Sequence, residues 1–201
     1  MRNFLFVIML FVFAVNLAAQ EQTLFNDDYK TSGFGGPVVK FTNINDQFAV
    51  LIGGRGGWIL NHSLLLGGGL YGVANEVDAP EGALPLEGPL DIEFGYGGFE
   101  LEYIIHPKSL VHYSVYTLIG AGATNYVKKF NSFFESNEQA GETDFLFVLQ
   151  PAVNAELNVT TWFRLNAGIS YLLVVGVDQN ALDNQDFSGI AAILTFKFGK
   201  F

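Results

Sequence analysis

The chain has 201 residues, a length that suits one domain, and it contains no Cys. Disulfides and thiolate chemistry are therefore excluded. The formal net charge of −10 at pH 7 disfavours binding to nucleic acid, which requires Lys and Arg to displace counterions. Half of the residues are hydrophobic and only 15% are charged, with 20 Phe and 23 Gly. This composition is typical of a sheet protein that exposes apolar surface to something other than water.

The first nineteen residues predict a secretory signal peptide. Arg2 supplies a short positive region, Phe4–Val15 is an unbroken apolar run, and Leu17-Ala18-Ala19 offers small residues for cleavage. The alternative, a transmembrane anchor, requires about 20 apolar residues, and this run is shorter. Residues 20–32 are polar and suit a periplasmic lead-in. The folded domain is therefore expected at residues 33–201.

Eight stretches of alternating apolar residues predict eight strands, because successive side chains of a strand point to opposite faces. Turn residues separate these stretches. The predicted strands are Gly35–Thr42, Gln47–Leu60, Ser63–Ala74, Leu90–Ile105, Leu110–Thr124, Asp144–Val159, Trp162–Val175 and Gly189–Phe201.

The strand Leu90–Ile105 contains an irregularity, because its apolar face changes phase at Gly97-Gly98. In its first half, Phe94 lies on the apolar face and Asp91 and Glu93 lie opposite. A slip of one residue would otherwise bury the wrong face, so the sequence predicts a glycine-assisted β-bulge there.

The last strand ends in an aromatic residue that is out of phase. Phe196 and Phe198 fall on the apolar face, Lys197 falls on the opposite face, and Phe201 does not follow the alternation. Either Gly199 allows a local twist that restores the direction of Phe201, or the strand closes at Phe198 and residues 199–201 form a short tail.

Three observations favour a membrane barrel. The strands are mostly ~9–15 residues long, whereas soluble strands usually have ~5–6 and tilted membrane strands need ~9–11. Short turns at Asn61, His106 and Thr160 alternate with long loops, as periplasmic turns and outer loops do in up-and-down barrels. The expected outer loops are Asn75–Pro89, Asn125–Thr143 and Gly176–Asp186. The even strand number also places both termini on the periplasmic side.

The two faces of the strands suit this barrel. Aromatic residues fall on the apolar faces, several of them near strand ends, where membrane barrels carry aromatic girdles. A Lys or Arg that faces lipid at the midplane costs roughly 2–4 kcal/mol, so charged residues should point inward. The expected inward residues are Lys40, Arg55, Asp91, Glu93, Glu100, Glu102, Gln150, Asn154, Glu156, Arg164, Asn166 and Lys197. Carboxylates outnumber cations in this set.

An interior of this width is just filled by side chains. We therefore expect an ion and hydrogen-bond network that plugs the barrel, with a narrow polar conduit as the functional alternative. A soluble β-sandwich or a lipocalin-like calyx is the structural alternative. It would have to bury more aromatic side chains than the interior of eight strands can hold.

With its signal peptide, eight strands, alternating loop lengths and terminal Phe201, the chain resembles the small eight-stranded outer-membrane barrels of Gram-negative bacteria, of the outer-membrane protein A and X type. The resemblance covers residues 33–201 and is architectural. It implies an all-β fold, an eight-stranded antiparallel up-and-down transmembrane β-barrel in the cell outer membrane. The glycine-rich segments Ile52–Trp58, Gly67–Gly69 and Phe94–Gly98 also look like uncharacterised barrels of Bacteroidetes-type bacteria.

His112 and Ser114 are the sharpest indication of an enzyme. Two positions apart on a strand, they share a face, as a base and a nucleophile would. The segment His112-Tyr113-Ser114 looks like the His-x-Ser of outer-membrane lipid A deacylases. That family also uses an acid, and Tyr126 stands at the comparable position here. His112 also lies beside a predicted periplasmic turn, whereas lipid A is in the outer leaflet. We therefore expect both residues in the interior network and no catalytic site.

The segment Asp178–Asp186 carries several oxygen ligands that suit calcium. Its spacing departs from that of an EF-hand loop, so we expect a solvated acidic loop and no metal. The glycines Gly67–Gly69 lie inside a strand with no helix after them, which argues against a nucleotide site. No cofactor is expected.

These observations predict a monomeric outer-membrane β-barrel with a filled polar interior. Its expected partners are outer-membrane lipid and a surface ligand or protein at the outer loops. A structural or surface-interaction role is favoured, and no specific activity is indicated. A lipid-modifying enzyme of the lipid A deacylase type and a narrow-pore channel are the alternatives.

Overall fold

A computed structural model describes residues 30–84, 89–128 and 139–201. The predicted signal peptide, residues 1–19, lies outside this part of the chain, as does most of the predicted lead-in. Of the lead-in, residues 31 and 32 belong to the first strand. No helix in the described ranges has the length and apolarity to cross a membrane.

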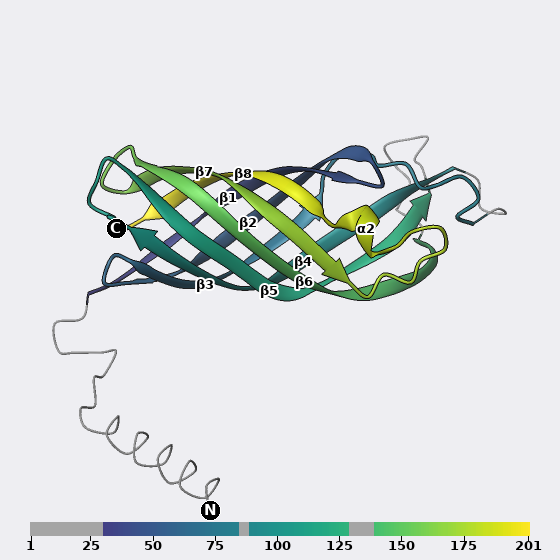
Figure 1. The fold of residues 1–201 in the computed structure, drawn as a ribbon, viewed down its shortest axis with the longest axis horizontal. Coiled ribbons are helices and arrows are strands. Elements are labelled where there is room, and N and C mark those ends of the chain that lie inside the picture. Colours follow the sequence, from purple (N-terminus) through teal and green to yellow (C-terminus); the bar gives the residue numbers. More distant parts are fainter. Residues whose placement is uncertain (1–29, 85–88, 129–138) are drawn as a thin grey trace, which may run out of the picture.

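Eight antiparallel strands close into a barrel in chain order (Figure 1). They are β1 (Thr31–Ile44), β2 (Gln47–Leu60), β3 (Leu64–Val73), β4 (Leu90–Ile105), β5 (Val111–Lys128), β6 (Gln139–Asn158), β7 (Phe163–Val175) and β8 (Gly189–Gly199). β8 pairs with β1 and closes the sheet. A short helix, α2 (Asn184–Phe187), precedes β8. The predicted eight-stranded up-and-down barrel is confirmed.

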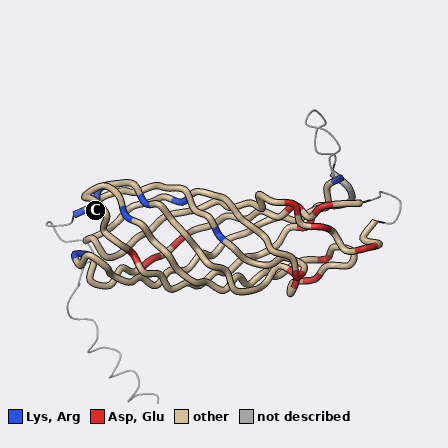
Figure 2. Tube along the Cα trace, turned by 90° about the horizontal axis from the view of Figure 1, so that it is seen from above, with Lys and Arg blue, Asp and Glu red and all other residues tan. Residues whose placement is uncertain are grey.

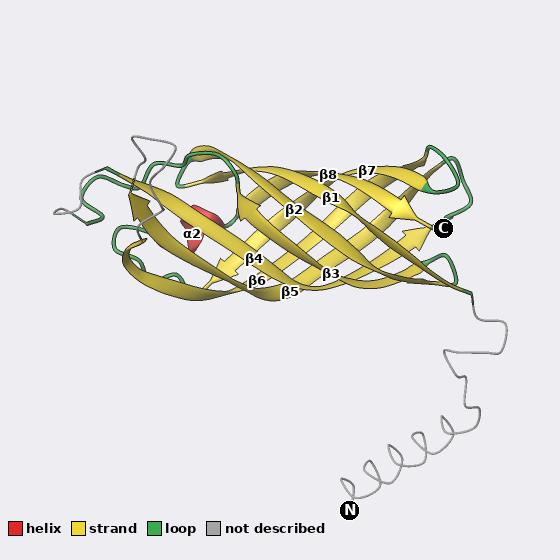
Figure 3. Cartoon of the chain, turned by 180° about the vertical axis from the view of Figure 1, so that it is seen from behind, coloured by secondary structure: helices red, strands yellow, loops and turns green. Residues whose placement is uncertain are grey.

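The two ends of the barrel differ in their connections (Figures 1 and 3). The C-terminus lies at one end with the short β2–β3, β4–β5 and β6–β7 connections, and we call this the turn end. The other four connections join strand ends at the opposite end of the barrel, which we call the loop end. One of these four, Asn45-Asp46, is a tight turn in which both residues have positive φ, of 50° and 56°. This backbone suits Asn and Asp, which tolerate the left-handed region better than other side chains.

The outer surface is apolar and carries aromatic side chains near both ends. At the turn end, Trp162 stacks on Phe198 with ring centroids 6.0 Å apart, and Trp58 is 70% exposed. Toward the loop end, Phe41 stacks on Phe48 at 6.2 Å. Exposed aromatic residues on a continuous apolar belt are the girdles of a membrane barrel. The belt identifies the surface that faces lipid.

The structure of β4 differs from the prediction of a β-bulge at Gly97-Gly98. Its pairing with both neighbours runs through Gly97 and Gly98 without a shift in register, so the predicted bulge is wrong. Phe94 points into the barrel, on the same side as the later glutamates, while Asp91 and Glu93 lie on the outer side. The residues of β4 that point inward are Leu90, Ile92, Phe94, Tyr96, Glu100, Glu102 and Ile104. The apolar pattern changes sides because the interior turns from apolar to polar along the strand.

β5 and β6 are longer than predicted, because the polar segment expected as a loop continues the strands. Residues Asn125–Lys128 pair with the start of β4, and Tyr126 pairs with Ala140 of β6. The irregularity in this sheet lies here, as a register shift between Thr124 and Tyr126. The hairpin therefore extends the sheet toward the loop end.

Phe201 folds back over the turn end. β8 ends at Gly199, and Phe201 packs against the buried cluster of Phe34, Ile59 and Leu65. Its ring also lies 4.0 Å from the guanidinium carbon of Arg164. Residues 200 and 201 therefore form a short tail, and the strand ends one residue later than in the predicted alternative that closed it at Phe198.

Candidate functional site

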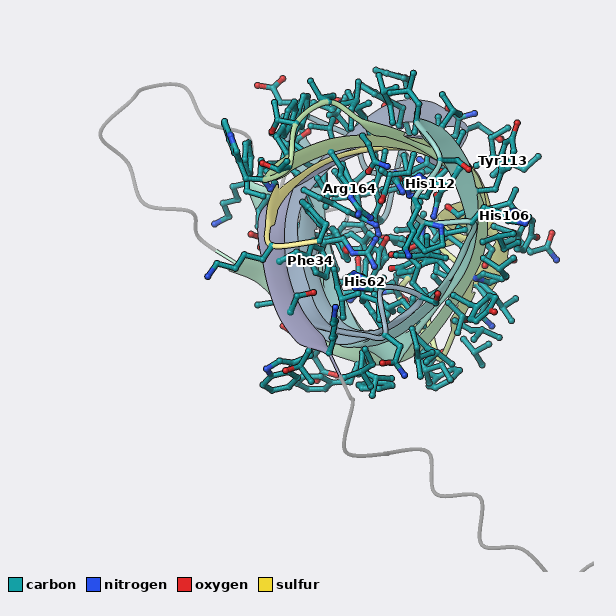
Figure 4. The ribbon with its side chains drawn as sticks, turned by 90° about the vertical axis from the view of Figure 1, so that its left-hand side faces the viewer. Phe34, His62, His106, His112, Tyr113 and Arg164 are labelled. Carbon is teal, nitrogen blue, oxygen red and sulfur yellow. The ribbon has the colours of Figure 1, made fainter. Side chains whose placement is uncertain are left out.

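The half of the interior nearer the turn end holds a buried ion network. Seen from this end, Phe34, His112 and Arg164 point into the barrel, while His106 and Tyr113 lie outside (Figure 4). We define the ion network by its charged members, which are Arg55, Glu100, Glu102, Glu156, Arg164 and Lys197. All of them are at least 93% buried. They come from six positions on β2, β4, β6, β7 and β8, so the network ties strands together across the barrel.

Glu102 is the centre of the network. Arg55 Nη2 lies 3.0 Å from its Oε2, and Lys197 Nζ lies 2.9 Å and 3.0 Å from its two oxygens. Ser114 Oγ also donates a hydrogen bond to Oε1 of Glu102 at 2.5 Å. Charge-assisted bonds of this length are the stronger ones in proteins. Removal of this carboxylate would leave two buried cations with fewer partners.

Glu156 and Glu100 extend the network on either side. Glu156 is paired with Lys197 at 2.5 Å, Arg164 at 3.0 Å and His112 Nε2 at 2.9 Å. Glu100 accepts from Arg55 Nε at 2.7 Å. The hydroxyls of Tyr71 and Tyr116 also donate to Glu100, at 2.6 Å and 2.9 Å. Each buried carboxylate is thus held by several donors, as burial of a charge requires.

Lys40 is the fourth buried cation of the described interior. Its Nζ donates to Gln150 Oε1 at 2.7 Å and to Tyr96 Oη at 3.0 Å, and it lies 3.2 Å from the ring centroid of Tyr71. Since Asp91 and Glu93 lie on the outer side, three buried carboxylates face four cations, and the predicted excess of interior carboxylates is wrong. The contacts of this additional basic group are aromatic rings, a Tyr hydroxyl and a neutral amide.

His112 and Ser114 share the inner face, as predicted, and are 1% and 2% exposed. They bond to different carboxylates, His112 to Glu156 and Ser114 to Glu102. No hydrogen bond joins them among the described residues. Tyr126 lies near the loop end, where its hydroxyl donates to the carbonyl of Asn180. The structure therefore places these three residues in separate contacts.

The half of the interior nearer the loop end is apolar, which sequence reasoning missed. Inward residues from several strands form its core, among them Val38, Leu51, Phe94, Leu118, Val148 and Leu172. Four residues from the connections are inserted into this core and are at most 6% exposed: Val77, Ala83, Leu182 and Phe187. The rings of Phe187 and Phe94 lie 5.0 Å apart. The connections thereby plug the mouth of the barrel.

The β7–β8 connection is fixed by hydrogen bonds. Asp183 caps α2 through a capping box with Asp186, and Asn184 Oδ1 accepts from the backbone of Gly176 and Val177 at 2.9 Å each. The side chains of Asp183 and Asp186 thus bond to backbone N–H groups. In the described ranges, no three His, Cys, Asp or Glu side chains are arranged to hold a metal ion.

The surface of the loop end is strongly acidic. Figure 2 shows Asp and Glu gathered there and most Lys and Arg toward the turn end. The acidic residues are Asp46, Glu76, Asp78, Glu81, Asp91, Glu93, Glu142, Asp144, Asp178, Asp183 and Asp186. Among the described residues, Lys128 is the basic residue at this end, whereas Lys30, Lys108 and Lys200 lie at the turn end.

No protein-family model matches the chain, and no curated protein matches it. Several solved structures do match the chain. The chain is similar to Neisserial surface protein A, with 14% identity and a TM-score of 0.54 over 87% of this chain and 100% of that one. It is also similar to Ail, the attachment invasion locus protein of Yersinia pestis, with 13% identity and a TM-score of 0.48 over 85% and 97% of the chains. A third match is the outer membrane protein OprG of Pseudomonas aeruginosa, with 10% identity and a TM-score of 0.47 over 84% and 95%. The chain thus has the fold of the small eight-stranded β-barrels of the outer membrane.

Proposed function

We propose that this barrel is a monomer that acts at the cell surface through its loop end, and that neither solute transport nor catalysis is its role. The observation that carries the proposal is the closed interior. The ion network fills one half, and the apolar core with its inserted loop residues fills the other. This arrangement leaves the loop surface as the part of the molecule that is open to a partner outside the membrane.

The described part of the loop end is suited to this role because hydrogen bonds hold two of its connections against the strands. Asp178 N donates to Asp144 Oδ2 at 2.6 Å, which joins the β7–β8 connection to β6. Gln47 and Asp78 exchange two bonds, at 2.8 Å and 3.0 Å, which joins the β3–β4 connection to β2. A preordered surface loses less conformational entropy on binding than a mobile one.

The charge of the loop end sets the kind of partner. An acidic surface attracts basic partners and repels polyanions, and it does so mainly through the rate of association. We therefore propose a basic protein or peptide as the ligand. Outer-membrane lipid is the proposed partner of the apolar belt, and nucleic acid is disfavoured by the same negative charge.

An enzymatic role for His112 and Ser114 is not proposed. Both side chains are buried in the turn half and bonded to glutamates, whereas a nucleophile needs a base within hydrogen-bond reach and access to substrate. Mass spectrometry of lipid A from cells that overproduce the protein provides the check. Unchanged lipid A agrees with this proposal, and a deacylated product would reject it.

The proposed ligand class is tested with proteoliposomes that carry the barrel with its loop end outward. A fluorescent oligolysine should bind, heparin should not, and oligolysine binding should fall with salt, because exposed charges are screened beyond about 8 Å at 0.15 M ionic strength. Glu81→Gln, Glu142→Gln and Asp178→Asn together should weaken binding. The matched control neutralises Lys108 and Lys200 at the turn end. Equal binding by both variants would contradict the proposal.

A further inference from the structure

The apolar belt is interrupted by a groove on its outer face. The groove has a volume of about 630 Å³ and is almost entirely apolar. Its floor consists of small residues, which are Gly72, Gly95, Gly97, Ala121 and Ala123, and its walls are Ile52, Leu70 and Phe145. The floor follows the register of the sheet, with Gly72 opposite Gly95 and Gly95 opposite Ala123. We call this feature the outer groove.

The packing of the sheet does not require all of these glycines. A Cβ on Gly95 would meet its nearest atom, a backbone oxygen, at 3.4 Å, and one on Gly72 would do so at 3.9 Å, which are ordinary contacts. Gly98 differs, because a Cβ there would lie 2.4 Å from the carbonyl oxygen of Ile119. The fold therefore demands glycine at position 98 and not at 72 or 95. At those two positions the absence of a side chain keeps the groove open.

Two carboxylates stand at the end of the groove nearer the loops. Ile92 N donates to Val77 O at 2.7 Å, and an isolated bridge joins Asp78 to Asp91, so the β3–β4 connection returns to the side of β4 beyond the end of the β3–β4 ladder. In the register of this bridge Glu76 stands opposite Glu93, and both are exposed. Glu93 is two residues before Gly95 and therefore lies on the same face as the floor.

Side-by-side carboxylates repel one another, and a bound cation relieves this repulsion. Within the part of the chain that the structure describes, neither Glu76 nor Glu93 forms an ion pair. The groove therefore offers a long apolar floor at membrane depth and a negative charge where the belt ends. A single kind of molecule matches both features, an amphiphile with an alkyl chain and a positive headgroup.

We propose that the outer groove holds one acyl chain of a membrane lipid whose headgroup carries an amine, with the ammonium group between Glu76 and Glu93. Lipid is the medium around this belt, and a chain packed on a recessed floor makes more contacts than one on a convex surface. The proposal depends on the membrane placement of the barrel and not on a ligand at the loops, so each can fail without the other.

The test is native mass spectrometry of the purified barrel in detergent with added phosphatidylethanolamine or phosphatidylglycerol of identical chains. Chelator is present throughout, so that divalent cations cannot bridge a phosphate to the carboxylates. Wild type should retain phosphatidylethanolamine in preference to phosphatidylglycerol. Ala121→Leu, which fills the floor, should weaken retention about tenfold, because the leucine occupies the space where the chain packs.

The matched control is Ala167→Leu, a likewise exposed position on the outer face of β7 that does not line the groove. It should retain lipid like wild type. The double variant Glu76→Gln with Glu93→Gln should bind both lipids equally, because the headgroup preference is lost while the floor remains. Heat-modifiable gel migration confirms that each variant is folded.

Three results would overturn the proposal. The first is equal lipid retention by Ala121→Leu and Ala167→Leu. The second is equal retention of the two lipids by wild type. The third is a dimer in the mass spectrum that Ala121→Leu abolishes while lipid retention is unchanged, since the groove would then be a contact between two copies of the chain.

Discussion

The two halves of the barrel interior are closed by opposite chemistry. In the turn half, charged residues lie inside and apolar residues outside, and Glu102 with Lys197 is the centre of that interior. In the loop half, apolar residues lie inside, and Asp91 and Glu93 lie on the outer side of the same strand that carries Glu102. The turn half is therefore filled by charged residues and the loop half by an apolar core, while exposed apolar residues such as Phe41, Phe145 and Ile190 continue along the outer face of the loop half. Asp91 and Glu93 mark the level near the loop end at which the outer face passes from the apolar phase into water.

The halves also differ in what a substitution should break. The ion network joins distant strands through a few strong bonds, so the loss of one member affects the whole barrel. The apolar core of the loop half includes residues from connections, such as Phe187, that can detach without opening the sheet. Damage in the turn half should therefore be global, and damage in the loop half should be local.

The largest effect is expected for Glu102→Gln. It removes the central charged partner of Arg55 and Lys197, which then keep Glu100 and Glu156 respectively. Breaking a buried pair in this way costs about 3–5 kcal/mol. The free energy of unfolding is measured by urea titration in detergent micelles, followed by gel migration of unheated samples. Glu93→Gln on the outer face serves as the control and should lie within about 0.5 kcal/mol of wild type. Equal stability of both variants would show that the network does not stabilise the barrel.

Phe187→Ala should have a comparable but local effect. Truncation of a buried Phe costs about 3–5 kcal/mol, and here the connection can release from the mouth of the barrel instead of unfolding the sheet. Limited proteolysis should cut the β7–β8 connection faster, while unheated samples still migrate as folded barrels. Gln185→Ala, an exposed change on the same helix, is the control. Loss of the barrel itself would contradict the separation of the two halves.

The smallest effects are expected at the C-terminus. Phe198 belongs to the aromatic girdle and is 43% exposed, whereas Phe201 packs inside the turn end. We expect Phe198→Ala to lower the level of membrane-inserted protein more than Phe201→Ala. The latter should cost about 1 kcal/mol of stability, partly through its cation–π contact with Arg164. Quantitative blots of outer-membrane fractions compare the two variants. Loss of insertion for Phe201→Ala alone would reverse this ranking.

Alternation in the sequence predicted which residues share a face for nearly all strands. For β6, β7 and β8 it also predicted the inner face, because Glu156, Arg164 and Lys197 mark it clearly. Alternation cannot say which face is inside, however, and polarity decides that only where the interior is uniform. In β4 the assumption of a uniformly polar interior placed Asp91 and Glu93 inside and required a bulge that does not exist.

The plug of the loop end could not be predicted in the same way. Val77 and Phe187 lie in segments whose composition is that of a polar loop, and their burial depends on how two connections meet over the mouth of the closed barrel. Isolated apolar residues among Asp and Asn were the signal available in the sequence. The partners within the ion network were also beyond prediction, since they join strands that are not neighbours, such as β4 and β8.

The closed interior is tested most directly by conductance of the purified protein in planar lipid bilayers. Wild type should give no stepwise current at any applied voltage, because both halves are filled. Phe187→Ala should also be silent, because the ion network still closes the turn half. Reproducible single-channel steps from wild type would contradict the closed interior and favour a narrow-pore channel.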